Sequence, residues 1–181
     1  MNLINNENMK LYKLGILLVV ILAGLSFTSC EDEEWVRSRL DISTYPDDPY
    51  TNSSGRLAVT FDLYDTDIEN YNPSRDRLLN IELYKSTLEV YSRDFRYDDR
   101  LDVTIETNYG TTFNARLYVD RDGYGYIDSN DGAFGNFMYD VVNQLASRGR
   151  ISMTFYIDTG INQRIPIGID LLNDLNLFIR Y

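Results

Sequence analysis

The stretch Arg56–Leu63 (RLAVTFDL) decides the fold class of this chain. Apolar side chains stand at every second position from Leu57 to Leu63, and Thr60 and Asp62 stand among the residues between them. A period of two is the pattern of a β-strand with one face packed and one face in water. The stretch therefore predicts a half-buried strand.

The same alternation recurs along the rest of the chain, with polar turn clusters between the runs. The further runs are Leu79–Leu83, Leu88–Val90, Leu101–Ile105, Phe113–Val119, Ile151–Ile157 and Ile165–Ile169. Many short strands separated by turns are typical of antiparallel sandwiches and barrels. We expect a mainly β, sandwich or barrel-like domain over residues 56–181.

The C-terminal segment Asp170–Tyr181 fits two patterns. Its leucines suit a helix capped by Asp170, and its last residues suit a strand reached through a turn at Asn173-Asp174. We favour the strand, because aromatic and β-branched residues gather at the end of the segment.

One segment has the period of a helix. Between Phe134 and Leu145, apolar residues recur at spacings of three and four, which places them on one face of an amphipathic helix. Asp131 can cap its start and Gly149 can end it. The sequence predicts a single helix that packs this apolar face on the sheet.

Composition excludes several classes of function. The chain has 181 residues, a net charge of −11, one cysteine and no histidine. Without histidine, Ser-His-Asp and Cys-His catalysis are excluded, and a conventional zinc site is not expected. The acidic balance argues against a nucleic-acid partner, because phosphates require Lys and Arg.

The N-terminal segment has the parts of an export signal. Lys10 and Lys13 precede the apolar run Leu14–Leu25, and small polar residues lead to Cys30. The run is shorter than the roughly 20 residues of a membrane-spanning helix, and an ordinary signal peptide with a coincidental cysteine is the other alternative. The segment resembles a bacterial lipoprotein signal, which implies that residues 1–29 are removed and that Cys30 is lipidated.

An acidic run follows the cysteine: Glu31, Asp32, Glu33 and Glu34. It is similar to the export tag of surface lipoproteins of the Bacteroidetes, which implies a lipid-anchored protein of the outer membrane, exposed on the cell surface. A solvated charge run is the simpler interpretation. We expect residues 30–55 to form a polar tether, with Trp35–Ser43 as an alternative edge strand.

The segment Asp120–Asp131 is the best candidate for a metal site, because it resembles the calcium loop of EF-hands. The resemblance places Gly125 at the sharp turn and implies a set of oxygen ligands for Ca²⁺, namely Asp120, Asp122, Tyr126, Asp128 and Asp131. The alternative is a hairpin that turns at Asp122-Gly123, with Tyr124 and Tyr126 on the returning strand.

Fifteen tyrosines are many for a chain of this length. Exposed tyrosines can stack on a glycan or contact a protein ligand, although tyrosine is also a common strand residue. With no nucleophile motif present, we expect a monomer with a non-catalytic accessory or binding role at the cell envelope. The alternative is a carboxylate-dependent glycan-processing enzyme.

Overall fold

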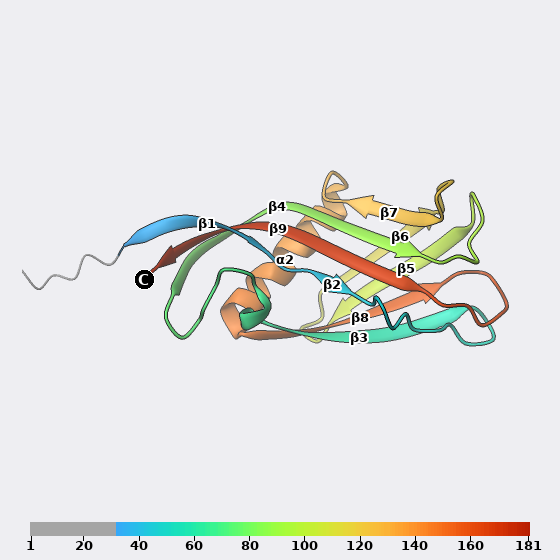
Figure 1. Ribbon diagram of the computed structural model, residues 1–181, viewed down its shortest axis with the longest axis horizontal. Helices are drawn as coiled ribbons and strands as arrows, with labels where there is room; N and C mark the ends of the chain where they lie inside the picture. Colours follow the sequence, from blue (N-terminus) through green and yellow to red (C-terminus); the bar gives the residue numbers. More distant parts are fainter. Residues whose placement is uncertain (1–31) are drawn as a thin grey trace, which may run out of the picture. The chain divides into compact units, whose positions relative to one another are not determined.

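The computed structural model describes residues 32–181, which form two antiparallel β-sheets and one long helix (Figure 1). The strands are β1 (Glu33–Arg39), β2 (Ile42–Ser43), β3 (Arg56–Tyr64), β4 (Arg77–Tyr91), β5 (Arg100–Thr107), β6 (Thr112–Tyr118), β7 (Tyr124–Asp128), β8 (Arg150–Asp158) and β9 (Gly168–Arg180). The helix is α2 (Gly132–Arg148), and a single 3-10 turn, η1, spans Asp65–Asp67. The mainly β fold and the two-sheet architecture confirm the fold class expected from the alternating runs.

The first sheet has the strand order β1-β9-β4-β7, and β2 pairs with β9 as well. The second sheet has the order β3-β8-β5-β6. The C-terminal segment is the strand β9, as favoured, but the turn expected at Asn173-Asp174 is wrong. Asn173 lies inside β9 and is buried, where its side chain accepts a hydrogen bond from Ser86 Oγ (2.7 Å) and donates one to the carbonyl of Leu40 (2.6 Å).

Two of the expected strands, Leu79–Leu83 and Leu88–Val90, are parts of one strand, β4. Register shifts between Leu78 and Asn80 and between Leu83 and Lys85 interrupt its pairing with β9. Each shift interrupts the alternation of apolar and polar residues along β4. One continuous strand therefore appears in the sequence as two short ones.

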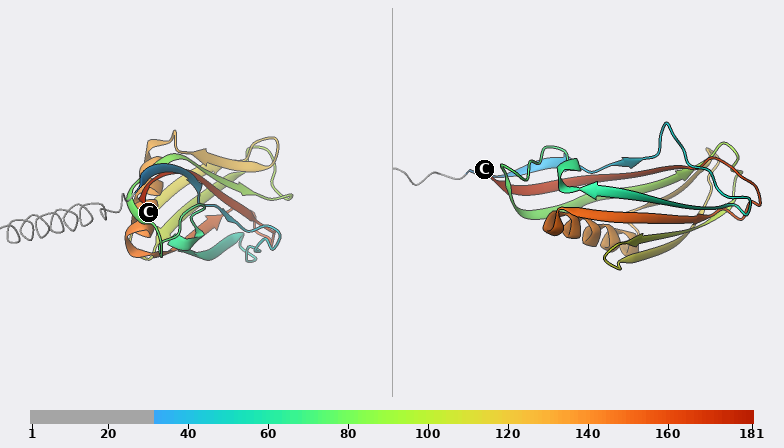
Figure 2. Two further views of the ribbon diagram at one scale, coloured as in Figure 1. Left: turned by 60° about the vertical axis from the view of Figure 1, so that its left-hand side comes forward. Right: turned by 90° about the horizontal axis from the view of Figure 1, so that it is seen from below.

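The helix closes the core between the two sheets. Its buried side chains, from Phe134 to Leu145, contact β4 and β7 of the first sheet and β6 and β8 of the second (Figure 2). The ring of Phe113 on β6 lies 5.2 and 5.6 Å from those of Phe134 and Phe137. The Asp131 carboxylate caps the first turn, and Gly149 ends the helix in the left-handed conformation, both as expected.

The predicted tether, residues 30–55, is wrong for most of its length. From Glu33 to Arg39 the chain is an edge strand paired with β9, which is the alternative that the sequence left open. Further along, Thr51 is buried and its N–H donates to the carbonyl of Ile165 (2.9 Å). Prolines and turn residues suggested a tether, but in the structure they form a loop held by the sheet, so the folded domain begins at Glu33.

Candidate functional site

The outer face of the first sheet is the candidate site. Burial alternates along β9, so that Ile169, Leu171 and Leu175 point into the core while Asp170 and Leu172 point to the outside. The register then places five side chains together at the end of the sheet where β4 stops. Tyr91 lies opposite Gly168 and Tyr124, and Glu89 lies opposite Asp170 and Tyr126. We call Glu89, Tyr91, Tyr124, Tyr126 and Asp170 the tyrosine–carboxylate face.

Tyr91 lies flat across the neighbouring strand because that strand has a glycine there. A Cβ added to Gly168 would lie 2.0 Å from Cε2 of the Tyr91 ring. The ring of Tyr124 packs beside that of Tyr91, with 5.4 Å between their centroids and 45° between their planes. Tyr124 and Tyr126 stay 39% and 47% exposed, so aromatic surface remains open to a ligand.

Carboxylates surround these rings. Glu89 and Asp170 are direct cross-strand partners, an arrangement in which like charges destabilise an antiparallel sheet. Asp170 accepts a hydrogen bond from Ser43 Oγ (2.6 Å), and Asp48 of the loop after β2 accepts one from Thr44 Oγ1 (2.9 Å). Within residues 32–181, neither Glu89 nor Asp170 nor Asp48 forms an ion pair.

The hydroxyl of Tyr91 responds to this environment. Burial, followed by the nearby carboxylates of Asp170, Asp48 and Glu89, raises its pKa to about 12. The pKa of Tyr126 is also raised, mainly because its hydroxyl donates a hydrogen bond to Asp128 (2.8 Å). Carboxylates thus contribute to the raised pKa values of both tyrosines.

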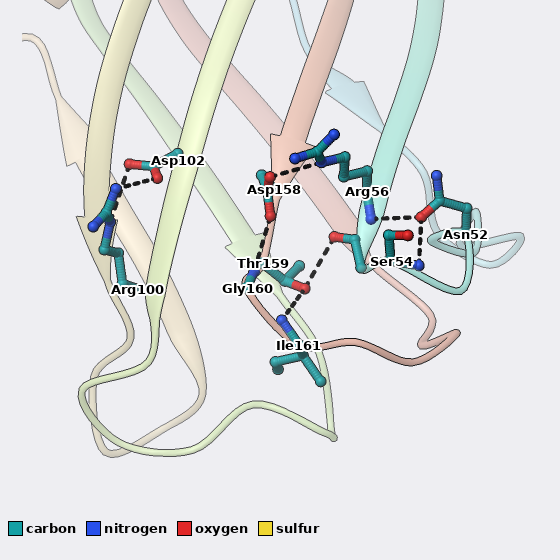
Figure 3. A network of polar contacts seen from close by, with 10 residues as sticks. Asn52, Ser54, Arg56, Arg100, Asp102, Asp158, Thr159, Gly160 and Ile161 are labelled. Atoms are coloured by element: carbon teal, nitrogen blue, oxygen red, sulfur yellow. Dashed lines mark hydrogen bonds and ion pairs between the residues drawn. The ribbon is translucent and has the colours of Figure 1, made fainter.

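On the second sheet, by contrast, several strand carboxylates form ion pairs. Asp158 pairs with Arg56 (2.9 Å), and Asp102 pairs with Arg100 and with Arg116 (3.0 Å), as Figure 3 shows for the first two arginines. Asp62, Asp102 and Asp158 on that sheet are thus paired with arginines of the same chain, whereas Glu89 and Asp170 of the tyrosine–carboxylate face are not, among the described residues.

Several exposed tyrosines elsewhere are already covered by arginine. Guanidinium carbons lie 4.2 to 5.7 Å from five ring centroids, in the pairs Arg148–Tyr109, Arg164–Tyr50, Arg150–Tyr64, Arg75–Tyr181 and Arg121–Tyr97. In the part of the chain that the structure describes, no such arginine covers Tyr91, Tyr124 or Tyr126. Tyr91, Tyr124 and Tyr126 therefore form an aromatic group that no arginine of residues 32–181 covers and that has acidic neighbours. Other exposed tyrosines outside the five pairs are Tyr45, Tyr84, Tyr118, Tyr139 and Tyr156.

The other half of the same face has a groove lined by charges of both signs. Arg37 and Arg39 of β1 line a groove of about 310 Å³ together with Glu69, Tyr84 and Asp174. Arg39 lies 3.4 Å from Asp174, so its charge is partly compensated. The outer face thus has an acidic, aromatic end and a second end with charges of both signs.

The segment expected to bind calcium adopts the hairpin-like alternative. The Asp120 carboxylate accepts hydrogen bonds from the N–H groups of Asp122 (2.9 Å) and Tyr124 (3.0 Å) and so closes a tight turn, in which Gly123 has φ of 90°. The returning strand, β7, pairs with β4, and its Gly125 forms an isolated bridge with Val119, the residue after β6.

The remaining predicted ligands are used locally. Asp128 accepts hydrogen bonds from Tyr126 and Asn130, and Asp131 caps the helix. Asp120 and Asp131 lie at opposite ends of β7, whose five residues span about 16 Å. No group of acidic residues that could hold a metal ion forms within residues 32–181. The predicted ligands do not converge in this structure, and calcium binding stays a prediction.

A glycine is required at position 125 by close packing rather than by the turn of a metal-binding loop. A Cβ there would lie 2.7 Å from Cδ1 of Leu101 and 3.3 Å from Cβ of Leu117. The glycine allows β7 to approach the second sheet closely, and a glycine required by packing looks the same in a sequence as one required by a turn.

The residues assigned to export lie partly outside the described part of the chain. Cys30 and Glu31 fall outside it, and Asp32 is its first residue. Glu33 and Glu34 belong to β1, where Glu33 forms an ion pair with Arg180 and Glu34 accepts a hydrogen bond from the Tyr181 hydroxyl. Two of the four acidic residues therefore also serve the sheet.

An enzyme that works with carboxylates needs a proton donor with a raised pKa. The pKa values of Asp62, Asp76, Asp102 and Asp128 are all lowered, in each case mainly by a hydrogen bond that the carboxylate accepts. These four groups are therefore suited to remain charged rather than to donate protons.

The sequence did not single out Glu89, Asp170 or Gly168. Their significance arises from cross-strand register between segments about 80 residues apart, which no local pattern reveals. One signal was present: Tyr124 and Tyr126 alternate on the strand that the hairpin alternative proposed.

No family model and no curated protein matches this chain. Among solved structures it is similar to one titled Desmodium yellow mottle tymovirus, with 6% identity, a TM-score of 0.38 and coverage of 83% of this chain and 90% of that one. A decameric BFDV capsid protein matches at 10% identity and a TM-score of 0.39, over 81% and 99% of the two chains. Similarities at this level support no inference about the function of this chain. Within residues 32–181, no helix has the length and apolar character needed to cross a membrane.

Proposed function

We propose that this protein is a lipid-anchored, surface-exposed protein of the cell envelope with a non-catalytic binding role, and that ligands bind to the tyrosine–carboxylate face. The observation that carries the binding role is the open aromatic group of Tyr91, Tyr124 and Tyr126 with unpaired carboxylates beside it. Exposed aromatic side chains with hydrogen-bonding groups at their edges are frequent in recognition surfaces.

The proposed anchor is attached at one end of the first sheet, and the proposed binding face lies at the other end. Glu33 begins β1 and lies opposite Arg180, which in turn lies opposite Arg77 at the start of β4. Tyr91 ends the same strand, 14 positions later, which corresponds to roughly 45 Å of extended chain. A lipid on Cys30, only three positions before Glu33, would hold the Glu33 end within about 10 Å of the membrane. The tyrosine–carboxylate face lies at the other end of the sheet from Glu33.

The fluorescence of Trp35 can report on the anchor. Trp35 is the only tryptophan of the sequence, is 51% exposed and lies near the Glu33 end of the sheet. In vesicles that contain doxyl-labelled lipids, the Trp35 fluorescence of the lipidated protein should be quenched. A Cys30→Ser variant added to the same vesicles should keep its fluorescence. Equal fluorescence of the two proteins would contradict anchoring at this end.

The binding role is tested with glycan and peptide arrays probed by the full-length protein. Binding should be lost in Tyr124→Ala/Tyr126→Ala and kept in Tyr139→Ala, whose ring is exposed on the helix. Array binding that survives the double substitution would exclude this face. Turnover of an arrayed glycan would instead favour the glycan-processing alternative.

A further inference from the structure

Three features of the tyrosine–carboxylate face bear on the chemistry of its ligand: the charge balance, the exposed rings and the position of the carboxylates relative to the rings. The inference concerns the same face as the proposed binding role and rests on it.

The charge balance is negative and uncompensated. Glu89 and Asp170 face each other across β4 and β9, Asp48 lies beside Tyr91, and none of the three forms an ion pair within residues 32–181. Lys85 is a basic neighbour, and it contributes to the lowered pKa of Asp128 at the border of the face. On the second sheet, by contrast, strand carboxylates such as Asp102 and Asp158 have arginine partners.

A like-charged cross-strand pair costs stability in the free protein. Local arrangements that oppose folding without an internal compensation are expected mainly at functional sites. A cation placed between Glu89 and Asp170 would remove this repulsion, whereas a neutral ligand would leave it.

The rings favour the same kind of ligand. A cation over an aromatic face is attracted by the negative potential of the ring, and guanidinium groups also stack on it. This chain uses that contact five times with its own arginines, on Tyr50, Tyr64, Tyr97, Tyr109 and Tyr181. Tyr124 and Tyr126 are exposed to a similar degree and take no such arginine from the described part of the chain.

The arrangement also fixes where each part of a cation would lie. Tyr124 packs against Tyr91, and Tyr126 stands opposite Glu89 on the adjacent strand. A side chain lying on Tyr124 or Tyr126 can therefore direct its N–H donors to the Glu89 and Asp170 carboxylates. Charge-assisted hydrogen bonds of this kind are the strong ones, and the planar, many-donor guanidinium suits them best.

We infer that the tyrosine–carboxylate face binds an arginine-containing basic segment of a partner protein, with guanidinium groups seated on Tyr124 and Tyr126 and hydrogen-bonded to Glu89 and Asp170. The segment contributes the positive charge that the face lacks. The calcium ion expected from the sequence is not the cation of this site, because its predicted ligands are used for the turn, Asn130 and the helix cap.

The test uses the full-length protein in detergent micelles and two fluorescent decapeptides, one with four arginines spaced by glycine and serine and one with citrulline in their place. Citrulline keeps the shape of arginine but carries no charge. Anisotropy at 0.15 M salt should show binding of the arginine peptide, with affinity at least about tenfold lower for the citrulline peptide, since charge-assisted bonds dominate.

Two variants report on the two parts of the face. Glu89→Gln/Asp170→Asn should weaken binding of the arginine peptide by about tenfold or more, and Tyr124→Ala/Tyr126→Ala by about fivefold to tenfold. Asp140→Asn and Tyr139→Ala, which change the same residue types on the exposed helix surface, should stay within about twofold, because long-range charge effects are screened.

Three results would overturn the inference. Equal binding of both peptides would show that charge is irrelevant, and equal weakening by Asp140→Asn and by the Glu89/Asp170 variant would show attraction to net charge only. Binding of a neutral oligosaccharide that depends on Tyr124 and Tyr126, without peptide binding, would refute the basic ligand yet leave the proposed binding face intact. Absence of any ligand sensitive to Tyr124→Ala/Tyr126→Ala would refute the binding face itself.

Discussion

Replacing Glu89 by glutamine removes one of two carboxylates that face each other across β4 and β9, so we expect the free protein to become more stable. Directly opposed side chains have Cβ atoms about 5 Å apart, and such like-charged pairs cost roughly 0.2–1 kcal/mol. Glutamine keeps the length and shape of the side chain, and no hydrogen bond to the Glu89 side chain is lost within the described residues. We expect a gain in the free energy of unfolding of about 0.5 kcal/mol, within the range for such pairs.

Urea unfolding of wild type and Glu89→Gln measures this gain. For a domain of this size it corresponds to a rise in Tm of about 1–2 °C. The gain should shrink in 1 M NaCl, where the Debye length falls to about 3 Å. Asp102→Asn is the matched control with the opposite sign, because Asp102 has arginine partners, and we expect it to lose about 0.5–1 kcal/mol.

The result that would refute this reasoning is a Glu89→Gln variant less stable than wild type. A gain that 1 M salt leaves unchanged would refute the electrostatic origin as well. A substitution that stabilises the free protein and weakens binding of a basic peptide would show that Glu89 is kept for recognition rather than for folding.

Four further predictions concern other parts of the molecule. Gly168→Ala should destabilise by about 1–3 kcal/mol because its Cβ would overlap the Tyr91 ring, and urea unfolding should show most of that loss restored when Tyr91→Ala is added. Asn173→Ala should cost about 2–3 kcal/mol by the same measurement, because buried partners on β4 and at Leu40 lose their hydrogen bonds; unchanged stability would show that this contact contributes nothing. The pKa of Tyr91 is raised from an ordinary 10 to about 12, so the unfolded chain loses this proton first and stability should fall as pH rises from 10 towards 12; the fall should be smaller in Tyr91→Phe. Cys30→Ser should abolish incorporation of labelled acyl chains and release the protein from membranes, and a variant that is still labelled would exclude lipidation at this cysteine.

The strands and the helix were predictable because their patterns are local. Alternation from Leu57 to Leu63 and the three-and-four spacing from Phe134 to Leu145 depend only on which face of an element is buried. The helix caps at Asp131 and Gly149 were also predictable from the sequence, since each cap acts within a few residues.

Predictions failed where distant segments meet. Residues 33–51 look like a tether because prolines and polar residues dominate part of them, but pairing with β9 makes them part of the sheet. Gly125 looked like a calcium-loop glycine, whereas its reason is the close approach of β7 to Leu101 and Leu117. A local motif cannot show which of two distant partners a residue serves.

By itself, the sequence determined the mainly β class, the helix after Asp131 and its caps, and the absence of histidine chemistry, because these follow from composition and short-range periodicity. Only the tertiary structure decided that Glu89 stands beside Asp170, that Tyr91 lies over Gly168, and that five other tyrosines are covered by arginines. Cross-strand register joins residues about 80 positions apart, and it is set by the packing of the whole core rather than by either strand alone.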